Sequence, residues 1–173
     1  MLAWGLGRWL DISPLDRLQF DLEGAALGVA ATGPMLLGLA WTVTTIWRPA
    51  RELVALVTDQ LGPLLAGCSV LQLALLAALA GVAEEILFRG VVQAGLVRVV
   101  SVPVGLVAAS VLFGLAHFAS RAYAALATVL GVYLGALFLL QGNLLVPIIA
   151  HALYDFVALN YLVRRHRASH LPA

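Results

Sequence analysis

The chain has 173 residues, of which 62% are hydrophobic and only 11% are charged, and its mean hydropathy is +1.00. Soluble domains carry about 25% charged residues, so this composition excludes an ordinary soluble domain and predicts an integral membrane protein in a lipid bilayer. The net charge of +1, without a basic stretch interleaved with aromatic residues, argues against a nucleic-acid partner. No glycine-rich phosphate-binding motif is present, so we expect no nucleotide either.

The N-terminal residues 1–23 mix charged side chains with Trp4 and Trp9, and the charges interrupt any apolar core that a cleavable signal peptide would need. Because tryptophan rings favour the membrane–water boundary, we predict an interfacial segment here. Residues 24–47 contain no charged side chain and are long enough to cross a bilayer, so they form the first expected span.

Residues 48–67 have a different pattern, because leucine and valine recur at helical spacing beside arginine, glutamate and aspartate. We predict an amphipathic helix that lies on the membrane surface, and a partial sixth span is the alternative. The next two spans are expected at residues 69–98 and 101–120, because serine followed by proline at 101–103 is typical of the start of a helix.

The last two spans are expected at residues 122–140 and 144–163, separated by the sequence QGN at 141–143. Residues 164–173 follow as an arginine-rich tail. The predicted fold class is therefore all-α: a polytopic membrane helix bundle at residues 24–163, with about five transmembrane helices and one amphipathic interfacial helix.

The arginines indicate the orientation of the chain, since short cytoplasmic loops carry an excess of positive charge. Five spans would bring six arginines to one face of the membrane and three to the other. The first group is Arg48, Arg51, Arg121, Arg164, Arg165 and Arg167, and the second is Arg8, Arg17 and Arg98. We therefore predict a cytoplasmic C-terminus.

Ionisable side chains inside the predicted spans are the strongest functional signal. They are Glu84, Glu85, Arg89, His117, His151 and Asp155. Each costs about 3 kcal/mol near the centre of a bilayer on insertion scales, so such groups usually face a bundle interior or a water-filled cavity. Glu85 lies four residues before Arg89, and His151 lies four before Asp155, so each pair shares one face of a helix.

The turn at 100–101 adds a geometric expectation. If the helices on its two sides pair antiparallel, residues equally far from the turn lie at equal depth. Glu84 and His117 meet this condition, and so do Phe88 and Phe113. We therefore expect a carboxylate and an imidazole at one level on adjacent helices.

A carboxylate beside an imidazole can hold a water molecule, take its proton and direct it at a carbonyl carbon. A second imidazole with an acidic neighbour can stabilise the oxyanion that forms, so the set predicts amide hydrolysis. We expect Glu84 to be catalytic, with Glu85 and Arg89 as a supporting pair. The alternative is a zinc ion held by Glu84, His117 and His151 with an open position for water.

Three motifs give a family resemblance: EEILFR at 84–89, FGLAH at 113–117 and HALYD at 151–155. They resemble the motifs EExxxR, FxxxH and HxxxN/D of the CPBP family, the CAAX-protease and bacteriocin-processing (Abi) intramembrane proteases. The resemblance covers roughly residues 69–163, which we take as the protease core. It implies an endopeptidase acting on a peptide or protein substrate at the membrane.

The resemblance also implies roles for individual residues. The positions that match Glu84 and His117 activate water in the family, and those that match His151 and Asp155 form the oxyanion site. The full candidate catalytic set is Glu84, Glu85, His117, His151 and Asp155, supported by Arg89 and Phe113. The eukaryotic enzymes carry asparagine in place of Asp155, and an aspartate there favours a role in orienting His151.

Several alternatives remain open at this level. Members of the family have been described both as metalloproteases and as metal-independent glutamate proteases; our preferred interpretation requires no cofactor, and zinc is the alternative. A non-catalytic scaffold or immunity protein would keep the same polar core. A proton-coupled transporter would predict broken helices and internal repeats, which the sequence does not display. The expected location is the plasma membrane of a bacterium, where prenylated CAAX proteins are not expected as substrates.

Overall fold

The computed structural model describes residues 2–169, and all regular structure in that part of the chain is helical. The elements are α1 (Leu2–Leu10), α2 (Leu22–Thr44), α3 (Arg48–Leu65), α4 (Val70–Glu85), η1 (Ile86–Gln93), α5 (Ala94–Val99), α6 (Val102–Ala116), α7 (Arg121–Gln141) and α8 (Leu145–Ser169). The predicted fold class, a polytopic bundle of membrane helices, is confirmed.

Within the described residues, four helical stretches are long and apolar enough to cross a membrane. They are α2, the continuous stretch Val70–Val99, α7 and α8. The remaining predicted span is shorter than expected: α6 has 15 residues and ends at Ala116 rather than near Ser120. A helix of that length rises only about 22 Å. It is shortened because Ser120 caps the next helix, where its hydroxyl accepts a hydrogen bond from the Tyr123 amide at 3.1 Å.

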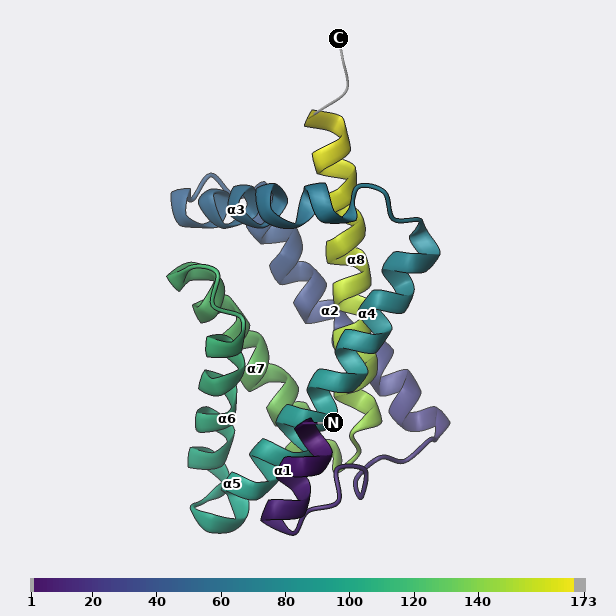
Figure 1. Ribbon diagram of the computed structural model, residues 1–173, viewed down its shortest axis with the longest axis vertical. Coiled ribbons are helices and arrows are strands. Elements are labelled where there is room, and N and C mark those ends of the chain that lie inside the picture. Colours follow the sequence, from purple (N-terminus) through teal and green to yellow (C-terminus); the bar gives the residue numbers. More distant parts are fainter. Residues whose placement is uncertain (1, 170–173) are drawn as a thin grey trace.

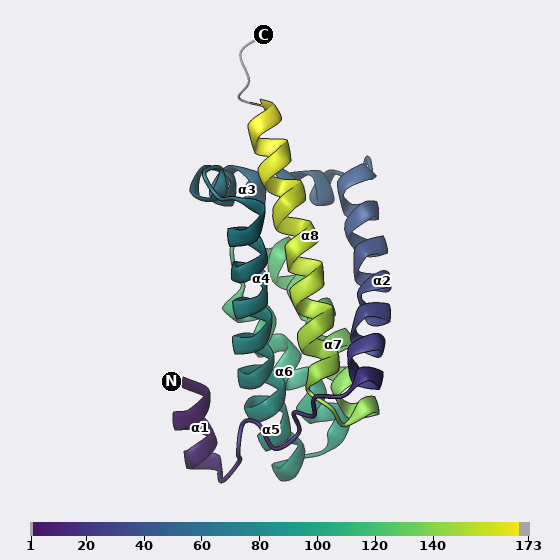
Figure 2. The same cartoon turned by 90° about the vertical axis from the view of Figure 1, so that its right-hand side faces the viewer.

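The helices form two layers (Figure 1). In one layer α8 lies between α2 and α4, as Figure 2 shows, and it packs against both of them. In the other layer α6 packs against α7. The two layers meet where η1 and α5 contact α6, while α3 crosses the opposite end of the bundle.

Helix α3 is amphipathic, as predicted, and it lies across the bundle rather than through it (Figure 1). Its buried side, which includes Ala50, Leu53 and Gly62, faces the bundle, and its two arginines, Arg48 and Arg51, are exposed. Membrane-surface helices have this division between an apolar and a charged face. The structure thus supports the interfacial placement of the segment over a sixth span.

The arginine-rich segment after residue 163 is helical through Ser169, as a continuation of α8, and residues 170–173 of the predicted tail lie outside the described residues. Arg167 donates from Nη2 to the carbonyl oxygens of Ala66 (2.7 Å) and Cys68 (3.1 Å). These carbonyls follow the end of α3, so Arg167 holds the end of the surface helix against α8.

The N-terminal segment packs on the other end of the bundle. Ile12 and Pro14 are buried, and the guanidinium of Arg98 donates to the carbonyl oxygen of Asp11 at 2.9 Å. The side chain of Asn143 accepts from the Gln19 amide at 3.1 Å, which fixes the chain just before α2. The predicted interfacial segment therefore packs against the end of the bundle.

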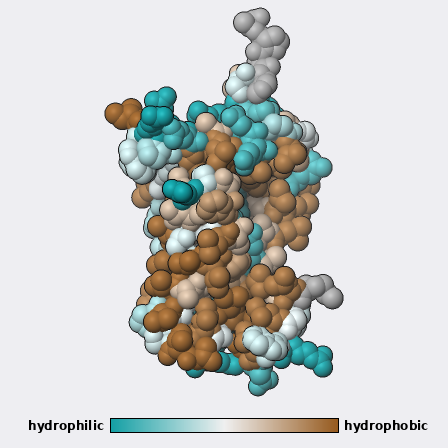
Figure 3. All heavy atoms as spheres, turned by 60° about the vertical axis from the view of Figure 1, so that its left-hand side comes forward, coloured by the Kyte–Doolittle hydropathy of each residue, from teal (hydrophilic) through white to brown (hydrophobic). Residues whose placement is uncertain are grey.

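The surface of the bundle is suited to lipid. Figure 3 shows hydrophobic side chains over most of the middle of one face and hydrophilic side chains gathered toward its two ends. The exposed apolar residues on α4, α6 and α7 include Leu75, Leu79, Val107, Val111 and Val129. Because a contiguous apolar surface of this kind is unfavourable in water, it indicates a bilayer around the middle of the bundle.

Candidate active site

The motif EEILFR at 84–89 lies in the continuous helical stretch Val70–Val99, where α4 passes into η1. A capping box begins α4, since Ser69 Oγ accepts from the Gln72 amide at 3.3 Å and Gln72 Oε1 accepts from the Ser69 amide at 2.8 Å. The helix is regular up to Glu85 and then continues as the π-helix η1. π-Helical turns are rare in proteins, and those that occur are often at functional sites. The periodicity of the sequence did not predict this one.

The deepest part of the site is a buried three-residue network. Glu85 is fully buried and Arg89 is 2% exposed. Glu85 Oε1 accepts from Arg89 Nη1 at 2.8 Å and lies 2.8 Å from His151 Nδ1. Arg89 Nη2 also donates to the carbonyl oxygen of Gly131 at 3.0 Å. The guanidinium thus compensates the buried carboxylate, and Glu85 in turn fixes the His151 ring.

Glu84 occupies a more open position next to His117. Glu84 Oε2 lies 3.3 Å from His117 Nε2, and the two side chains are 30% and 25% exposed. The other ring nitrogen, Nδ1, lies 2.8 Å from the carbonyl oxygen of Phe113. Because a carbonyl oxygen can only accept, Nδ1 carries a proton, and Nε2 is directed at the Glu84 carboxylate.

His151 connects the two parts of the site. Its Nε2 lies 3.4 Å from Asp155 Oδ2 and 3.9 Å from Glu84 Oε2, while Nδ1 contacts Glu85. Both ring nitrogens therefore face carboxylate oxygens. The structure brings together all five sequence-predicted candidates from α4, from the end of α6 and from α8.

Phe113 forms the centre of an aromatic cluster in this site. Its ring centroid lies 5.0 Å from that of Phe88, 4.4 Å from that of His117 and 5.9 Å from that of His151. Arg89 Cζ lies 4.6 Å from the Phe113 centroid, which is the geometry of a cation–π contact. The structure therefore places both predicted equal-depth pairs, Glu84 with His117 and Phe88 with Phe113, in contact.

Two residues near the site were not singled out from the sequence. Gln93 is 1% exposed, and its Nε2 donates to the carbonyl oxygen of Gly135 at 3.0 Å. This bond lies one helical turn beyond the bond from Arg89 to Gly131, so the repeated spacing of four was an available signal. The ring centroid of Tyr123 lies 6.3 Å from that of His117; nothing in the sequence pattern indicated this contact.

Replacement of Gly135 by alanine is expected to destabilise the fold by about 1–3 kcal/mol. A Cβ at this position would overlap Gln93 Oε1 and would come within 2.6 Å of Leu106 Cδ1, so these two side chains must move. Gly38→Ala is the matched control, because a Cβ there meets nothing within 4 Å. Unfolding curves in detergent measure both changes; equal midpoints for the two variants would contradict the close-packing account.

A cavity of about 310 Å³ adjoins the polar residues. Phe113, His117, His151 and Asp155 line it, and Glu84 Oε2 is in contact with the two imidazoles among them. The rest of the wall is mostly apolar and includes Met35, Leu39, Val57, Leu61, Leu76 and Leu126. A cavity with this lining suits an apolar polypeptide segment with a polar backbone.

The structure also bears on the zinc alternative. Among residues 2–169, no three His, Cys, Asp or Glu side chains are arranged to hold a metal ion. Glu84, His117 and His151, the set named from the sequence, do not form such a group as placed.

The spans and the site together define a class: a polytopic helical membrane protein with a buried polar centre beside an apolar cavity. A family model described as type II CAAX prenyl endopeptidase Rce1-like matches residues 66–157, more than half of the chain. The chain therefore belongs to the Rce1-like family, which confirms the resemblance seen in its motifs. No curated protein and no solved structure gives a significant match.

Family membership supports a membrane peptidase that acts on a peptide substrate. The matched segment begins just before α4 and ends two residues after Asp155, so it contains all three site motifs. The N-terminal segment, α2 and all of α3 lie before the match.

Proposed function

We propose that the protein is an intramembrane endopeptidase in which Glu84 and His117 activate a water molecule. The contact of 3.3 Å between Glu84 Oε2 and His117 Nε2, beside the apolar cavity, carries this proposal. Both side chains keep about a quarter of their surface exposed, whereas Glu85 is fully buried. Glu84 is therefore the less buried of the two carboxylates, which favours it over Glu85 as the base.

The reaction begins with a water molecule held between Glu84 and Nε2 of His117. Glu84 takes a proton from this water while the water oxygen attacks the carbonyl carbon of the peptide. The proton then passes to the leaving nitrogen, and the C–N bond breaks. The products are a carboxylic acid, which then ionises to a carboxylate, and an amine, and no covalent bond to the enzyme forms.

His151 is proposed to stabilise the oxyanion through its Nε2–H group. Its Nδ1 is held by Glu85, and the Glu85–Arg89 pair is itself buried, so the ring is fixed before substrate binds. Asp155 Oδ2 lies 3.4 Å from Nε2, which supports a role for Asp155 as a positioning residue that orients the ring.

Asp155→Asn is expected to keep most of the activity, whereas Asp155→Ala is expected to reduce kcat by up to about 100-fold through misplacement of His151. The amide of asparagine preserves the size of the side chain and a hydrogen-bond contact with His151. Steady-state kinetics with a membrane-anchored peptide separate kcat from KM. If asparagine and alanine were equally inactive, an orienting role for Asp155 would be wrong.

The proposal requires no cofactor, and a strong zinc chelator is expected to leave the rate of cleavage unchanged. The measurement uses purified protein in lipid nanodiscs, a panel of membrane-anchored peptides, and metal analysis of the same samples. Activity that is lost with chelator and restored by added zinc would favour the zinc-dependent form of the reaction.

We infer a bacterial plasma membrane as the location, with the C-terminus in the cytoplasm. The arginine distribution supports this orientation, because α3, the α6–α7 turn and the end of α8 lie at one end of the molecule (Figure 1). His117 immediately follows α6, so the site lies toward this end. The proposed substrate is therefore a peptide segment close to the cytoplasmic boundary of the membrane.

A further inference from the structure

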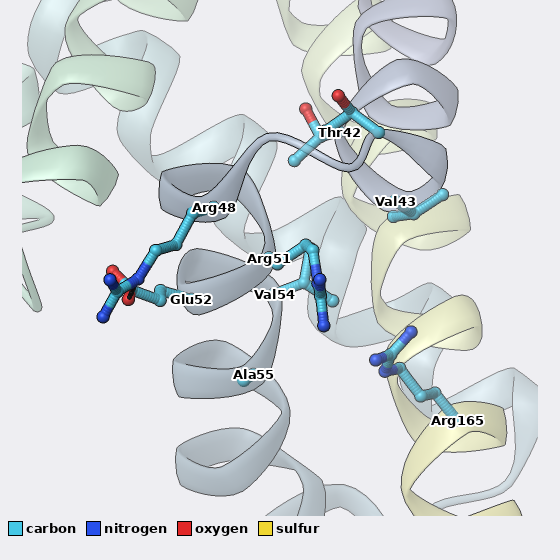
Figure 4. Close-up of a pocket in the computed structure, with 9 residues that line it drawn as sticks. Thr42, Val43, Arg48, Arg51, Glu52, Val54, Ala55 and Arg165 are labelled. Atoms are coloured by element: carbon cyan, nitrogen blue, oxygen red, sulfur yellow. Dashed lines mark hydrogen bonds and ion pairs between the residues drawn. The ribbon is translucent and has the colours of Figure 1, made fainter.

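A second pocket lies outside the candidate active site, where the end of α2, the start of α3 and α8 meet. Its volume is about 530 Å³. Figure 4 shows the residues that line it, which are Thr42, Val43, Thr45, Arg48, Arg51, Glu52, Val54, Ala55 and Arg165. None of these residues belongs to the three family motifs.

The pocket has an excess of positive charge that the protein does not compensate. Arg48 is paired with Glu52, with 2.7 Å between Nε and Oε1. Arg51 and Arg165 extend toward each other from α3 and α8 (Figure 4), and within residues 2–169 neither forms an ion pair with a carboxylate. Arg165 Nη1 donates to the neutral hydroxyl of Tyr161, at 3.2 Å. Two guanidinium groups in this position favour an anion between them.

The lining groups other than the arginines are suited to an amphiphilic ligand. The Thr45 hydroxyl oxygen accepts from the Trp47 amide at 3.2 Å, so its own O–H group can donate to an anionic oxygen. Val43, Val54 and Ala55 supply an apolar wall beside these donors. A ligand that fits this lining has a charged head and an apolar body.

The position of the pocket fits the depth of lipid headgroups. Trp41 and Trp47 lie next to lining residues in the chain, their ring centroids are 6.0 Å apart, and each is 56% exposed. Exposed tryptophans and a surface helix are typical of the membrane–water boundary. Anionic lipids bind basic pockets between membrane helices at this level.

We propose that this pocket binds the phosphodiester headgroup of an anionic glycerophospholipid, held between Arg51 and Arg165. Free phosphate shares the same chemistry, but the apolar wall and the interfacial position favour the lipid. Thr42, Val43 and Val54 line both this pocket and the cavity of the candidate active site. Lipid in the pocket therefore supports α3 at the place where it covers that cavity.

Binding is tested with purified protein in a neutral detergent, by titration with phosphatidylglycerol, phosphatidylcholine or inorganic phosphate. Native mass spectrometry counts the bound lipid, and thermal unfolding reports the stabilisation. Phosphatidylglycerol is expected to bind and to raise the unfolding midpoint, whereas phosphatidylcholine and inorganic phosphate are expected to do neither. Equal binding of phosphatidylcholine, or the same shift with inorganic phosphate, would overturn the proposal.

The variant Arg51→Gln/Arg165→Gln is expected to bind phosphatidylglycerol at least about tenfold more weakly. Its charge-matched control is Arg121→Gln/Arg164→Gln, which changes two exposed arginines of the same end that do not line the pocket. The control is expected to bind as the wild type does. An equal loss in both double variants would indicate attraction to surface charge alone and would overturn the specific site.

A third variant keeps all the charges. Ala55→Phe fills the pocket from its apolar wall and leaves both arginines in place. It is expected to weaken binding of phosphatidylglycerol by a similar factor, and unchanged binding would contradict the pocket as the site. The readout is lipid binding, so its outcome is independent of peptidase activity.

Discussion

Replacement of Glu84 by glutamine is expected to lower the rate of peptide hydrolysis by about 10²- to 10⁴-fold, because the carboxylate that accepts the proton of water is removed. The loss should appear in kcat, since the glutamine has nearly the same size and substrate binding is retained. Glu84 is 30% exposed and does not belong to the buried Glu85–Arg89 pair. The unfolding midpoint of the variant should therefore stay close to that of the wild type.

The matched control for Glu84→Gln is Glu23→Gln. Glu23 is an exposed carboxylate in the first turn of α2, outside the cavity and outside the family match. Its replacement is expected to leave the rate of hydrolysis unchanged. A Glu84→Gln protein that hydrolyses peptide as fast as the Glu23→Gln protein would remove Glu84 from the mechanism.

Replacement of Arg89 by methionine is expected to destabilise the fold by about 3–5 kcal/mol, because it leaves the Glu85 carboxylate buried without its cation. Arg89 also loses its bond to the Gly131 carbonyl oxygen and its contact over Phe113. Detergent-solubilised protein titrated with denaturant gives the free energy of unfolding. The double variant Glu85→Gln/Arg89→Met is expected to recover part of the loss, since no buried charge is then left unpaired.

The exposed ion pair of the chain provides a control for this prediction. Arg48 lies 2.7 Å from Glu52, but the two side chains are 87% and 62% exposed. Arg48→Gln should therefore change the free energy of unfolding by less than about 1 kcal/mol. If the effects of Arg89→Met and Arg48→Gln were similar, burial of the Glu85–Arg89 pair would not be a source of stability.

Much of the fold could be predicted from the sequence, because a bilayer restricts what an apolar chain can form. Uncharged stretches of about 20 residues predict spanning helices with few alternatives. The contact between Glu84 and His117 could be expected from their equal distances to the turn at 100–101. That expectation depended only on two helices pairing antiparallel.

Other features depend on tertiary contacts that no local pattern records. The end of α6 at Ala116 follows from the capping of α7 by Ser120, although the hydropathy continues beyond it. The π-helix at Ile86–Gln93 leaves the composition of the stretch unchanged, so periodicity did not reveal it. Gln93 was missed although it follows Arg89 by four residues, because its partner, the Gly135 carbonyl, is reached only through a tertiary contact.

The most direct test of the central claim is hydrolysis of membrane-anchored peptides by purified protein in water enriched with oxygen-18. The account predicts cleavage at a defined bond, one heavy oxygen in the new carboxylate of the wild-type product, and loss of this product in Glu84→Gln. A folded wild-type protein that cleaved no peptide in the panel, or cleaved equally well with glutamine at position 84, would contradict the account. The first result would favour a non-catalytic membrane scaffold that keeps the polar core of the family, and the second would assign the activation of water to another residue.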